Sequence, residues 1–233
     1  MDSSTYLTRR SELETYFDRT AADAWAKLTS DAPVSGIRAT VRAGRDDMRA
    51  TLVSWLPEDL SGRRILDAGC GAGQLSAEAA RRGAEVVAVD LSETLVGLAR
   101  ERFADAPFAA RIDLRVGDMF DPALGSFDHV VAMDSLIHYS GRDMIGVLEG
   151  FRARASESVL FTFAPRTPAL AAMHAAGKLF PRSDRAPAIQ PIGENRLRKA
   201  LNASNALGGW VPKRAKRIKS GFYISQAMEL ARP

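Results

Sequence analysis

The residues best suited to chemistry lie where an apolar run breaks into a glycine-rich turn. Residues 64–73 read Arg-Ile-Leu-Asp-Ala-Gly-Cys-Gly-Ala-Gly, and a helix-like segment follows. Glycine allows a sharp turn and lets a ligand touch the backbone, because no Cβ is in the way. The N–H groups that begin the next helix would face the same ligand. The pattern predicts a strand that delivers a nucleotide-type cofactor to a helix N-terminus.

Acidic side chains follow the next three apolar runs of the chain. Asp90, Asp118 and Asp134 each stand at the end of such a run or just after it. In open α/β sheets ligands bind at the carboxyl ends of the strands, and an acid after the second strand commonly holds a ribose diol. We therefore expect the three carboxylates to share a crevice with the glycine turn. As an alternative, Asp90 and Asp134 could cap helices that begin at Ser92 and Gly141.

The spacing of the glycines favours one kind of cofactor over another. A dinucleotide site has the pattern Gly-x-Gly-x-x-Gly, whereas here Gln74 holds the last position and Gly73 comes one residue early. Asp67 stands two residues before the first glycine. A carboxylate there is unfavourable for a pyrophosphate and suits a cation that carries an amino group and a sulfonium.

The segment Asp-Ala-Gly-Cys-Gly-Ala-Gly at 67–73 resembles motif I of the class I S-adenosylmethionine methyltransferases, and the three later acids resemble their later motifs. The resemblance implies that the backbone of the glycine turn holds the methionine part, that Asp90 binds the ribose hydroxyls, and that Asp118 with Met119 binds the adenine. Cys70 is expected to pack as a small residue, since no base stands beside it. The predicted cofactor-binding residues are Asp67, Gly69, Cys70, Gly71, Gly73, Gln74, Asp90, Leu91, Asp118, Met119 and Asp134.

The elements that must position these residues alternate along the chain. We expect strands at 64–68, 85–89, 112–116, 127–133 and 157–163, helices at 73–82, 92–104, 141–153 and near 193–205, and final strands at 211–220 and 222–231. This alternation predicts a doubly wound, mostly parallel sheet. Together with the resemblance it implies a class I methyltransferase Rossmann-like α/β fold with an antiparallel C-terminal strand.

The chain is predicted to have two regions. Residues 1–56 carry apolar residues at helical spacing and are expected to form an N-terminal helical arm or lid, broken at 31–33 and closed by Pro57. Residues 57–233 are expected to form the S-adenosylmethionine-binding domain. Within them, 164–191 are a proline-containing insertion after the fifth strand, with a helix expected at 168–179. Its aromatic, proline and arginine residues predict a substrate-recognition surface.

The composition narrows the class of protein. A single cysteine excludes a disulfide framework and fits a reducing compartment, and no stretch approaches the ~20 apolar residues of a membrane span. We expect a cytoplasmic protein with at most peripheral membrane contact. The net charge is +4, but residues 166–219 hold twelve Lys or Arg against two acids. Such a patch suits nucleic acid, anionic lipid or a carboxylate substrate, or it is a solvated basic face, with 213–219 as an exposed strand.

Segments outside the cofactor motifs resemble those of the magnesium-protoporphyrin IX O-methyltransferase family, and the resemblance covers nearly the whole chain. They are Tyr16-Phe17 with Trp25, Ser35-Gly36-Ile37-Arg38 leading into Gly44-Arg45, the segment 134–139, and the segment 161–168 running on to 177–181. The resemblance implies methyl transfer from S-adenosylmethionine to one propionate of Mg-protoporphyrin IX, giving the monomethyl ester and S-adenosylhomocysteine in (bacterio)chlorophyll biosynthesis, near photosynthetic membranes. It also implies the porphyrin-binding subunit of magnesium chelatase as a partner. The Asn/Asp-Pro-Pro-Tyr motif of nucleic-acid amino-methyltransferases is absent, which argues against a nucleic-acid substrate.

Such a substrate is a large apolar plate with two carboxylates on one edge, and it needs a groove with arginines at its mouth. We expect the N-terminal helices and the insertion to close over the plate. Tyr139 is expected to contact the substrate, and Arg166, Arg182 or Arg185 is expected to pair with the second propionate.

Two residues are predicted to act in catalysis. His138 follows the fourth strand and is expected to orient the propionate or accept a residual proton, and Tyr16 is expected to close over the cofactor and donate to the carboxylate. As alternatives, His138 is a structural histidine and Tyr16 is part of a helical core. His129 is expected to be exposed, and His174 is expected at the surface and not on the substrate magnesium. No cluster has the spacing of a dedicated metal site.

Two other functions fit the same motifs. One is an S-adenosylmethionine-dependent O-methyltransferase of another hydrophobic acid or of a phenol, such as a quinone precursor. The other is a non-catalytic S-adenosylmethionine-binding module that docks on a partner. The first would lack a porphyrin-sized groove, and the second would bind the cofactor without transferring its methyl group.

Overall fold

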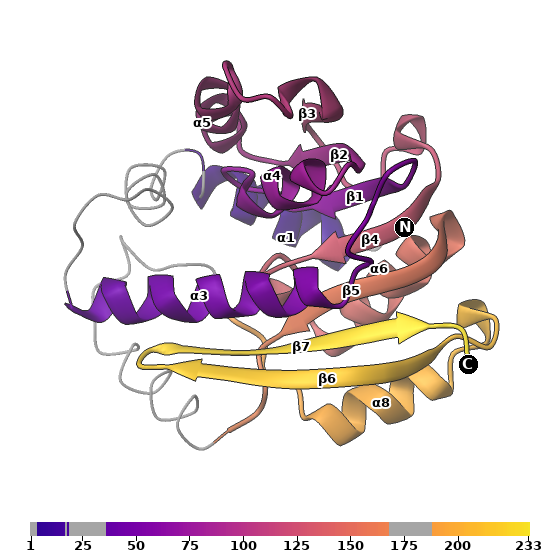
Figure 1. Ribbon diagram of the computed structural model, residues 1–233. Coiled ribbons are helices and arrows are strands. Elements are labelled where there is room, and N and C mark those ends of the chain that lie inside the picture. The colour runs from indigo at the N-terminus through magenta and orange to yellow at the C-terminus, as the bar shows by residue number, and fades with distance from the viewer. Residues whose placement is uncertain (1–3, 17, 19–35, 168–187) are drawn as a thin grey trace.

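Seven strands form one sheet in the order β3-β2-β1-β4-β5-β7-β6 (Figure 1). The computed structural model describes residues 4–16, 18, 36–167 and 188–233. β7 runs antiparallel to its neighbours β5 and β6, and every other pairing is parallel, which confirms the predicted fold class. The strands are β1 (Arg64–Ala68), β2 (Glu85–Asp90), β3 (Ile112–Val116), β4 (Phe127–Ala132), β5 (Ala155–Phe163), β6 (Val211–Ser220) and β7 (Tyr223–Ala231).

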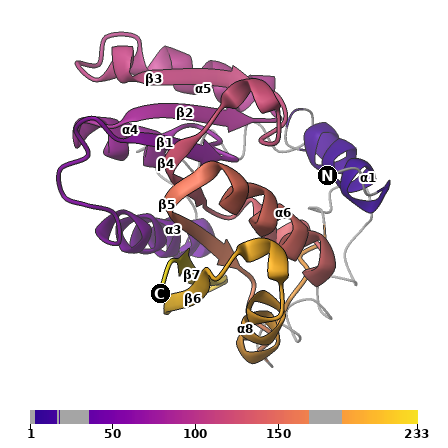
Figure 2. The same cartoon turned by 90° about the vertical axis from the view of Figure 1, so that its right-hand side faces the viewer.

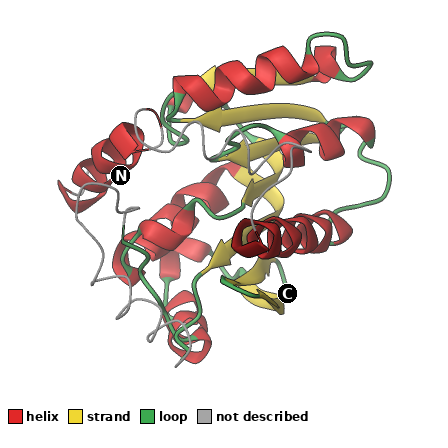
Figure 3. Ribbon diagram, turned by 90° about the vertical axis from the view of Figure 1, so that its left-hand side faces the viewer, coloured by secondary structure: helices red, strands yellow, loops and turns green. Residues whose placement is uncertain are grey.

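Helices cover both faces of this sheet (Figures 2 and 3). α1, α6 and α8 pack on one face, over Leu66, Val130 and Phe161. α3 and α4 pack on the other, over Ile65 and Leu160. The central strands are therefore buried on both sides, which is why their sequences are almost continuously apolar. The helices are α1 (Ser4–Thr15), α3 (Gly36–Ser54), α4 (Gln74–Arg81), α5 (Glu93–Phe103), α6 (Gly141–Arg154) and α8 (Glu194–Asn202), with 3₁₀ turns η2 (Ala109–Arg111), η3 (Pro122–Leu124), η4 (Leu136–His138) and η6 (Asn205–Leu207).

Two serines set the starts of the helices that follow β2 and β4. The side chain of Ser92 accepts a hydrogen bond from the backbone N–H of Leu95 at the start of α5. Ser140 does the same for Asp143 at the start of α6. The N-cap of α6 is therefore Ser140, so the alternative that Asp134 caps this helix is wrong.

The expectation that His129 is exposed is also wrong. The residue lies in β4, is 4% exposed, and has Nδ1 2.8 Å from Oγ of Ser158. The reason is its place in the sheet, since β4 lies between β1 and β5 and the register pairs His129 with Ile65 and Ser158. Burial lowers the pKa of the imidazole, so the neutral ring is favoured there.

The long helix α3 lies against the β6–β7 hairpin, with two glycines at the contact (Figure 1). A Cβ on Gly44 would lie 2.5 Å from Cδ1 of Tyr223. A Cβ on Gly221 would overlap the side chain of Thr40, and Gly221 has a φ of +54°. These close approaches fix the hairpin against α3 and place Arg45 beside the start of β7.

Several predictions concern residues outside the described part of the chain: the helix at 168–179, the break at 31–33, and the surface position of His174. The boundary between regions 1–56 and 57–233 stays a prediction, although α3 shares a core with the sheet. None of the described helices combines the length and the apolar character that crossing a membrane requires.

Candidate active site

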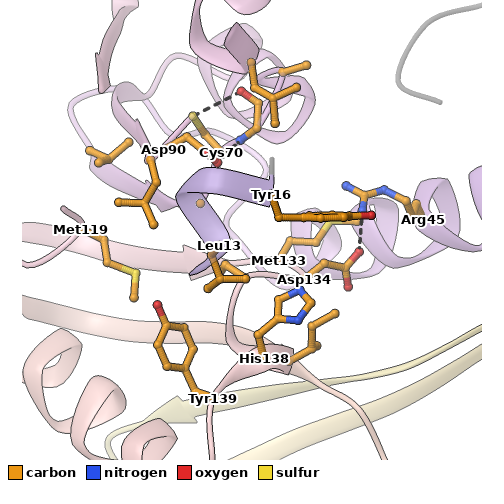
Figure 4. A pocket seen from close by; sticks show the side chains of 18 of the residues that line it. Leu13, Tyr16, Arg45, Cys70, Asp90, Met119, Met133, Asp134, His138 and Tyr139 are labelled. Carbon is orange, nitrogen blue, oxygen red and sulfur yellow. Dashed lines mark hydrogen bonds and ion pairs between the residues drawn. The ribbon is translucent and has the colours of Figure 1, made fainter. Parts of the chain in front are cut away.

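A pocket of about 290 Å³ lies at the carboxyl ends of the first four strands (Figure 4). Its walls come from the segments after β1, β2, β3 and β4, from α1 and α3, and from Tyr223 at the start of β7. The strand-end acids therefore share one crevice with the glycine turn, as predicted. The predicted site residues that line it are Tyr16, Gly69, Cys70, Gly71, Gln74, Asp90, Leu91, Asp118, Met119, Asp134, His138 and Tyr139.

The three glycines of the turn have different tasks. All have positive φ angles, +83° at Gly69, +54° at Gly71 and +78° at Gly73. A Cβ on Gly69 would lie 2.5 Å from Cβ of Ser135, and one on Gly73 would lie 2.6 Å from the ring of Phe103, whereas nothing lies within 4 Å at Gly71. Gly69 and Gly73 thus allow close packing, and Gly71 is where a ligand can approach the backbone.

Two predicted cofactor residues do not line the pocket. Gly73 is the N-cap of α4 and packs against Phe103 of α5. Asp67 is 1% exposed and accepts a 2.6 Å hydrogen bond from Oγ of Ser76. Burial, together with repulsion from Asp90, raises the pKa of Asp67 to about 7. Their direct contact with a cofactor stays a prediction.

Asp90 is held by backbone N–H groups of two segments, the glycine turn after β1 and the turn before α5. Its two carboxylate oxygens accept hydrogen bonds from the N–H of Gly71 at 2.8 Å and of Ser92 at 2.9 Å. Burial nonetheless raises the pKa of this carboxyl. The hydrogen bond from Ser92 N–H is consistent with the alternative that Asp90 helps to cap α5. The hydrogen bond from Gly71 N–H, however, connects Asp90 to the glycine turn that lines the pocket. The side chain lines the pocket, and its contact with the ribose stays a prediction.

Asp118 is joined to the first helix, which sequence reasoning did not predict. The hydroxyl of Tyr6 donates to its Oδ1 at 2.9 Å, and Arg10 pairs with its Oδ2 at 2.6 Å. The ring of Tyr6 stacks on Tyr139 with centroids 5.4 Å apart. Burial raises the pKa values of both tyrosines, so both hydroxyls stay protonated. α1 therefore covers the pocket above the predicted adenine position.

A polar cluster surrounds Asp134 at the end of β4. Its φ of +57° makes it the one non-glycine residue in the described chain with a positive φ. Nη1 of Arg45 lies 3.0 Å from Oδ2, the hydroxyl of Tyr223 donates to Oδ1 at 3.0 Å, and the backbone N–H of Asp134 donates to Oγ1 of Thr162 at 2.7 Å. Arg45 lines the pocket, but sequence reasoning named it only within a family-like segment and did not assign it to the site. A second available signal was its helical spacing from Val41 and Met48, which carry the apolar face of α3.

The two predicted catalytic residues come from different elements, since Tyr16 follows α1 and His138 ends η4. Figure 4 shows Tyr16 beside Arg45 and the imidazole of His138 below Asp134. His138 is 6% exposed and belongs to η4. Burial raises the pKa of the half-buried Tyr16. The structure places both side chains in the pocket, and their catalytic roles stay predictions.

The remaining predicted residues are less closely tied to the pocket. Cys70 lines it, packs against the core on the α3 side, and has a thiol pKa raised by burial, as expected of an unreactive thiol. Arg166 has an exposed side chain and does not line the pocket; its backbone N–H donates to the carbonyl oxygen of Ile192. Arg182 and Arg185 lie outside the described residues.

The doubly wound sheet, the glycine turn and the acids at the strand ends define a class I S-adenosylmethionine-dependent methyltransferase. A family model described as a methyltransferase domain matches residues 65–155, and one described as magnesium-protoporphyrin IX methyltransferase C-terminus matches residues 132–232. The chain belongs to the magnesium-protoporphyrin O-methyltransferase family. It is 47% identical over 227 residues to the magnesium-protoporphyrin O-methyltransferase of Rhodobacter capsulatus, an alignment that covers 97% of this chain and 98% of the relative.

More distant relatives agree with this assignment. The magnesium-protoporphyrin O-methyltransferase of Synechocystis is 29% identical, with 93% of this chain and 94% of the relative covered. The crystal structure of the Synechocystis magnesium protoporphyrin IX methyltransferase with bound S-adenosylhomocysteine superposes with a TM-score of 0.83 at 27% identity, covering 96% of this chain and all of that one.

Proposed function

We propose that this protein transfers the methyl group of S-adenosylmethionine to a propionate carboxylate of Mg-protoporphyrin IX. The observation that carries the proposal is that, in a chain of this family, one pocket joins the glycine turn and Asp90 to His138, Tyr16 and Arg45. The oxygen atoms of protoporphyrin belong to its two propionates. An O-methyltransferase that acts on it therefore forms an ester.

The residues present fit S-adenosylmethionine. The backbone is open at Gly71, where a side chain would otherwise fill the turn. Asp67 and Asp90 are buried carboxyls with raised pKa values, and each carboxyl contributes negative charge when ionised. A ligand with a positively charged sulfur and an amino group offsets this charge, whereas a pyrophosphate would add to it. We propose that the carboxylate of Asp90 also accepts hydrogen bonds from the ribose hydroxyls.

The chain needs to align the acceptor more than to deprotonate it. Bound S-adenosylmethionine supplies a methyl group on a sulfonium. A carboxylate oxygen attacks the methyl carbon, the C–S bond breaks, and its electron pair stays on sulfur. A carboxylate is already ionised at neutral pH, so no proton has to be removed. His138 and Tyr16 then orient the carboxylate, and α1 keeps water out. Positioning of this kind can supply ~7–11 kcal/mol of rate enhancement.

The apolar part of the pocket suits the tetrapyrrole plate. Leu13, Val41, Met133, Ile137 and Ile189 contribute apolar side chains to its walls. We further propose that the N-terminal arm and the insertion at 164–191 close over the part of the plate outside this pocket.

The proposal also covers how so apolar a substrate reaches the enzyme. We propose that the porphyrin-binding subunit of magnesium chelatase transfers the porphyrin to this protein, and that the protein contacts the photosynthetic membrane peripherally. Two exposed apolar side chains support a surface contact: Ile37 is 58% and Phe222 is 53% exposed, on either side of the Gly221–Thr40 contact. Co-sedimentation with vesicles, comparing the chain with its Phe222→Ser variant, tests the membrane contact; equal sedimentation would contradict a role for this patch.

The first test of the function is direct. The purified protein is incubated with methyl-labelled S-adenosylmethionine and Mg-protoporphyrin IX, and the extracted porphyrin is separated by chromatography. A labelled monomethyl ester is expected. Label on a quinone-precursor phenol with none on the porphyrin would favour the alternative acceptor, and cofactor binding with no transfer at all would favour the binding-module alternative.

A further inference from the structure

One cationic side chain faces the pocket within the described part of the chain. Arg45 is the only lysine or arginine among the described residues that line it. Its side chain is 19% exposed, and its partner Asp134 is 8% exposed. In Figure 4 the guanidinium lies across Tyr16 from Asp90 and Cys70, on the α3 wall. The cation is thus placed away from the glycine turn that receives the cofactor.

The support of this arginine is built into the fold. Asp134 adopts a left-handed backbone conformation that a non-glycine residue keeps only where its surroundings fix it. Thr162 on β5 and Tyr223 on β7 provide that fixation through hydrogen bonds of 2.7 Å and 3.0 Å. Gly44 lets α3 approach Tyr223 closely enough for Arg45 to reach the same carboxylate. Three separate elements therefore position one guanidinium.

The charge of the pocket shows why a cation is needed. Asp90, Asp118 and Asp134 contribute carboxylates to its lining, of which Asp118 pairs with Arg10 and Asp134 with Arg45. A dianionic substrate adds two negative charges to this lining, so a cation that contacts the substrate lowers the electrostatic cost of binding. A guanidinium carries five N–H donors in a planar fork and can serve two carboxylates on different edges. Asp134 contacts Nη1 at 3.0 Å. An incoming carboxylate of the substrate would share the guanidinium with the groups that already contact it.

We propose that Arg45, held by Asp134, binds the propionate of the porphyrin that is not methylated, and so determines which propionate accepts the methyl group. The inference rests on the proposed function. The non-reacting carboxylate is the fitting partner, because an ion pair withdraws electron density from the oxygen that would have to attack the methyl carbon. The same role is predicted for Arg166, Arg182 or Arg185, of which Arg166 does not line the pocket and the other two lie outside the described residues.

The test pairs a variant with a modified substrate. Arg45→Met keeps the length of the stem and removes the charge, and Arg38→Met, at an exposed position of the same helix, is the control. The two ligands are Mg-protoporphyrin IX and its monoamide at the propionate that stays free in the product. Binding is followed by porphyrin absorbance with S-adenosylhomocysteine present, and turnover by ester formation.

The wild type and Arg38→Met are expected to bind the diacid about 10-fold to 100-fold more tightly than the monoamide, as for one charge-assisted pair. Arg45→Met is expected to bind both alike, with the loss in KM more than in kcat, and to give a mixture of the two ester isomers. Equal weakening of both ligands, or a single ester isomer from Arg45→Met, would overturn the proposal, because a purely structural ion pair gives that result.

Two further controls keep the outcome decisive. If Arg45→Met does not fold, Arg45→Gln is used, because Gln removes the charge and keeps N–H donors on a polar side chain; a retained preference for the diacid in this variant would again overturn the proposal. If the wild type forms no ester, the proposed function fails, while the absorbance titration still reports whether Arg45 distinguishes diacid from monoamide.

Discussion

The hydroxyl of Tyr6 donates a 2.9 Å hydrogen bond to Oδ1 of Asp118, which fastens the first helix to the acid predicted to meet the adenine. Arg10 reinforces the contact from one helical turn further along. The carboxylate that is predicted to meet the adenine is thus the one that holds α1.

Tyr6→Phe is therefore expected to weaken S-adenosylhomocysteine binding. The variant keeps the ring stacked on Tyr139 and removes one hydrogen bond to a charged acceptor, about 1.5–3 kcal/mol when fully buried and less at this half-buried site. The loss is expected in the dissociation rate, measured by stopped-flow fluorescence. Arg9→Ala is the control, since Arg9 pairs with Glu12 on its own helix. An unchanged dissociation rate would show that α1 does not retain the cofactor.

Asp90→Asn is expected to lower the affinity for both S-adenosylmethionine and S-adenosylhomocysteine about 10-fold to 100-fold, the loss for a hydrogen-bonded charged acceptor. The amide keeps the size of the side chain but replaces one of the two acceptor oxygens that hold Gly71 and Ser92. Titration calorimetry measures the change against Asp113→Asn, an exposed position on β3. Equal affinities in the two variants would refute the ribose contact.

His138→Ala is expected to lower turnover by about two to four orders of magnitude, the contribution typical of a positioned acid–base group, with cofactor and porphyrin binding near normal. His138→Gln separates two roles: an orienting side chain is largely replaced by the amide, whereas a proton acceptor is not. Initial rates across pH 6–9 record both variants. Full activity of His138→Ala would show that His138 has a structural role and no catalytic one.

The pH dependence of stability is expected to carry a signature of Asp67. Its pKa is raised from 3.8 in the unfolded chain to about 7 in the fold. The folded state therefore binds the proton more tightly, and the stabilisation is full below pH 3.8 and is lost as the pH rises through about 7. When the pH is raised from 5 to 8, the Tm of the wild type should fall several degrees further than the Tm of Asp67→Asn. Asp105→Asn, an exposed acid, should behave like the wild type; a parallel loss in Asp67→Asn would show that Asp67 ionises normally.

The sequence was sufficient to predict those site residues that lie at the ends of the sheet strands. The strands alternate with helices, and their carboxyl ends meet at one edge, so Asp90, Asp118 and Asp134 could be placed together without knowing any contact. The task of Gly73 could not be deduced, because the ring of Phe103 reaches it from another helix.

The missed residues are those that distant pairings bring to the site. Tyr223 reaches Asp134 because β7 inserts between β5 and β6, and no local pattern encodes that insertion. Tyr6 reaches Asp118 across 112 residues of sequence. His129 was placed at the surface because a lone histidine at a strand start is usually exposed, whereas its partner Ser158 lies on the neighbouring strand.

The insertion of β7 also leaves β6 as one outer edge of the sheet. An unpaired edge offers free N–H and C=O groups to a strand of a second molecule and so invites aggregation. β6 carries Pro212, which cannot donate, and the cationic side chains Lys213, Arg214, Lys216, Arg217 and Lys219, mostly exposed. Two copies approaching edge to edge would bring these charges face to face. The cationic side chains of β6 therefore oppose edge-to-edge pairing with a second sheet.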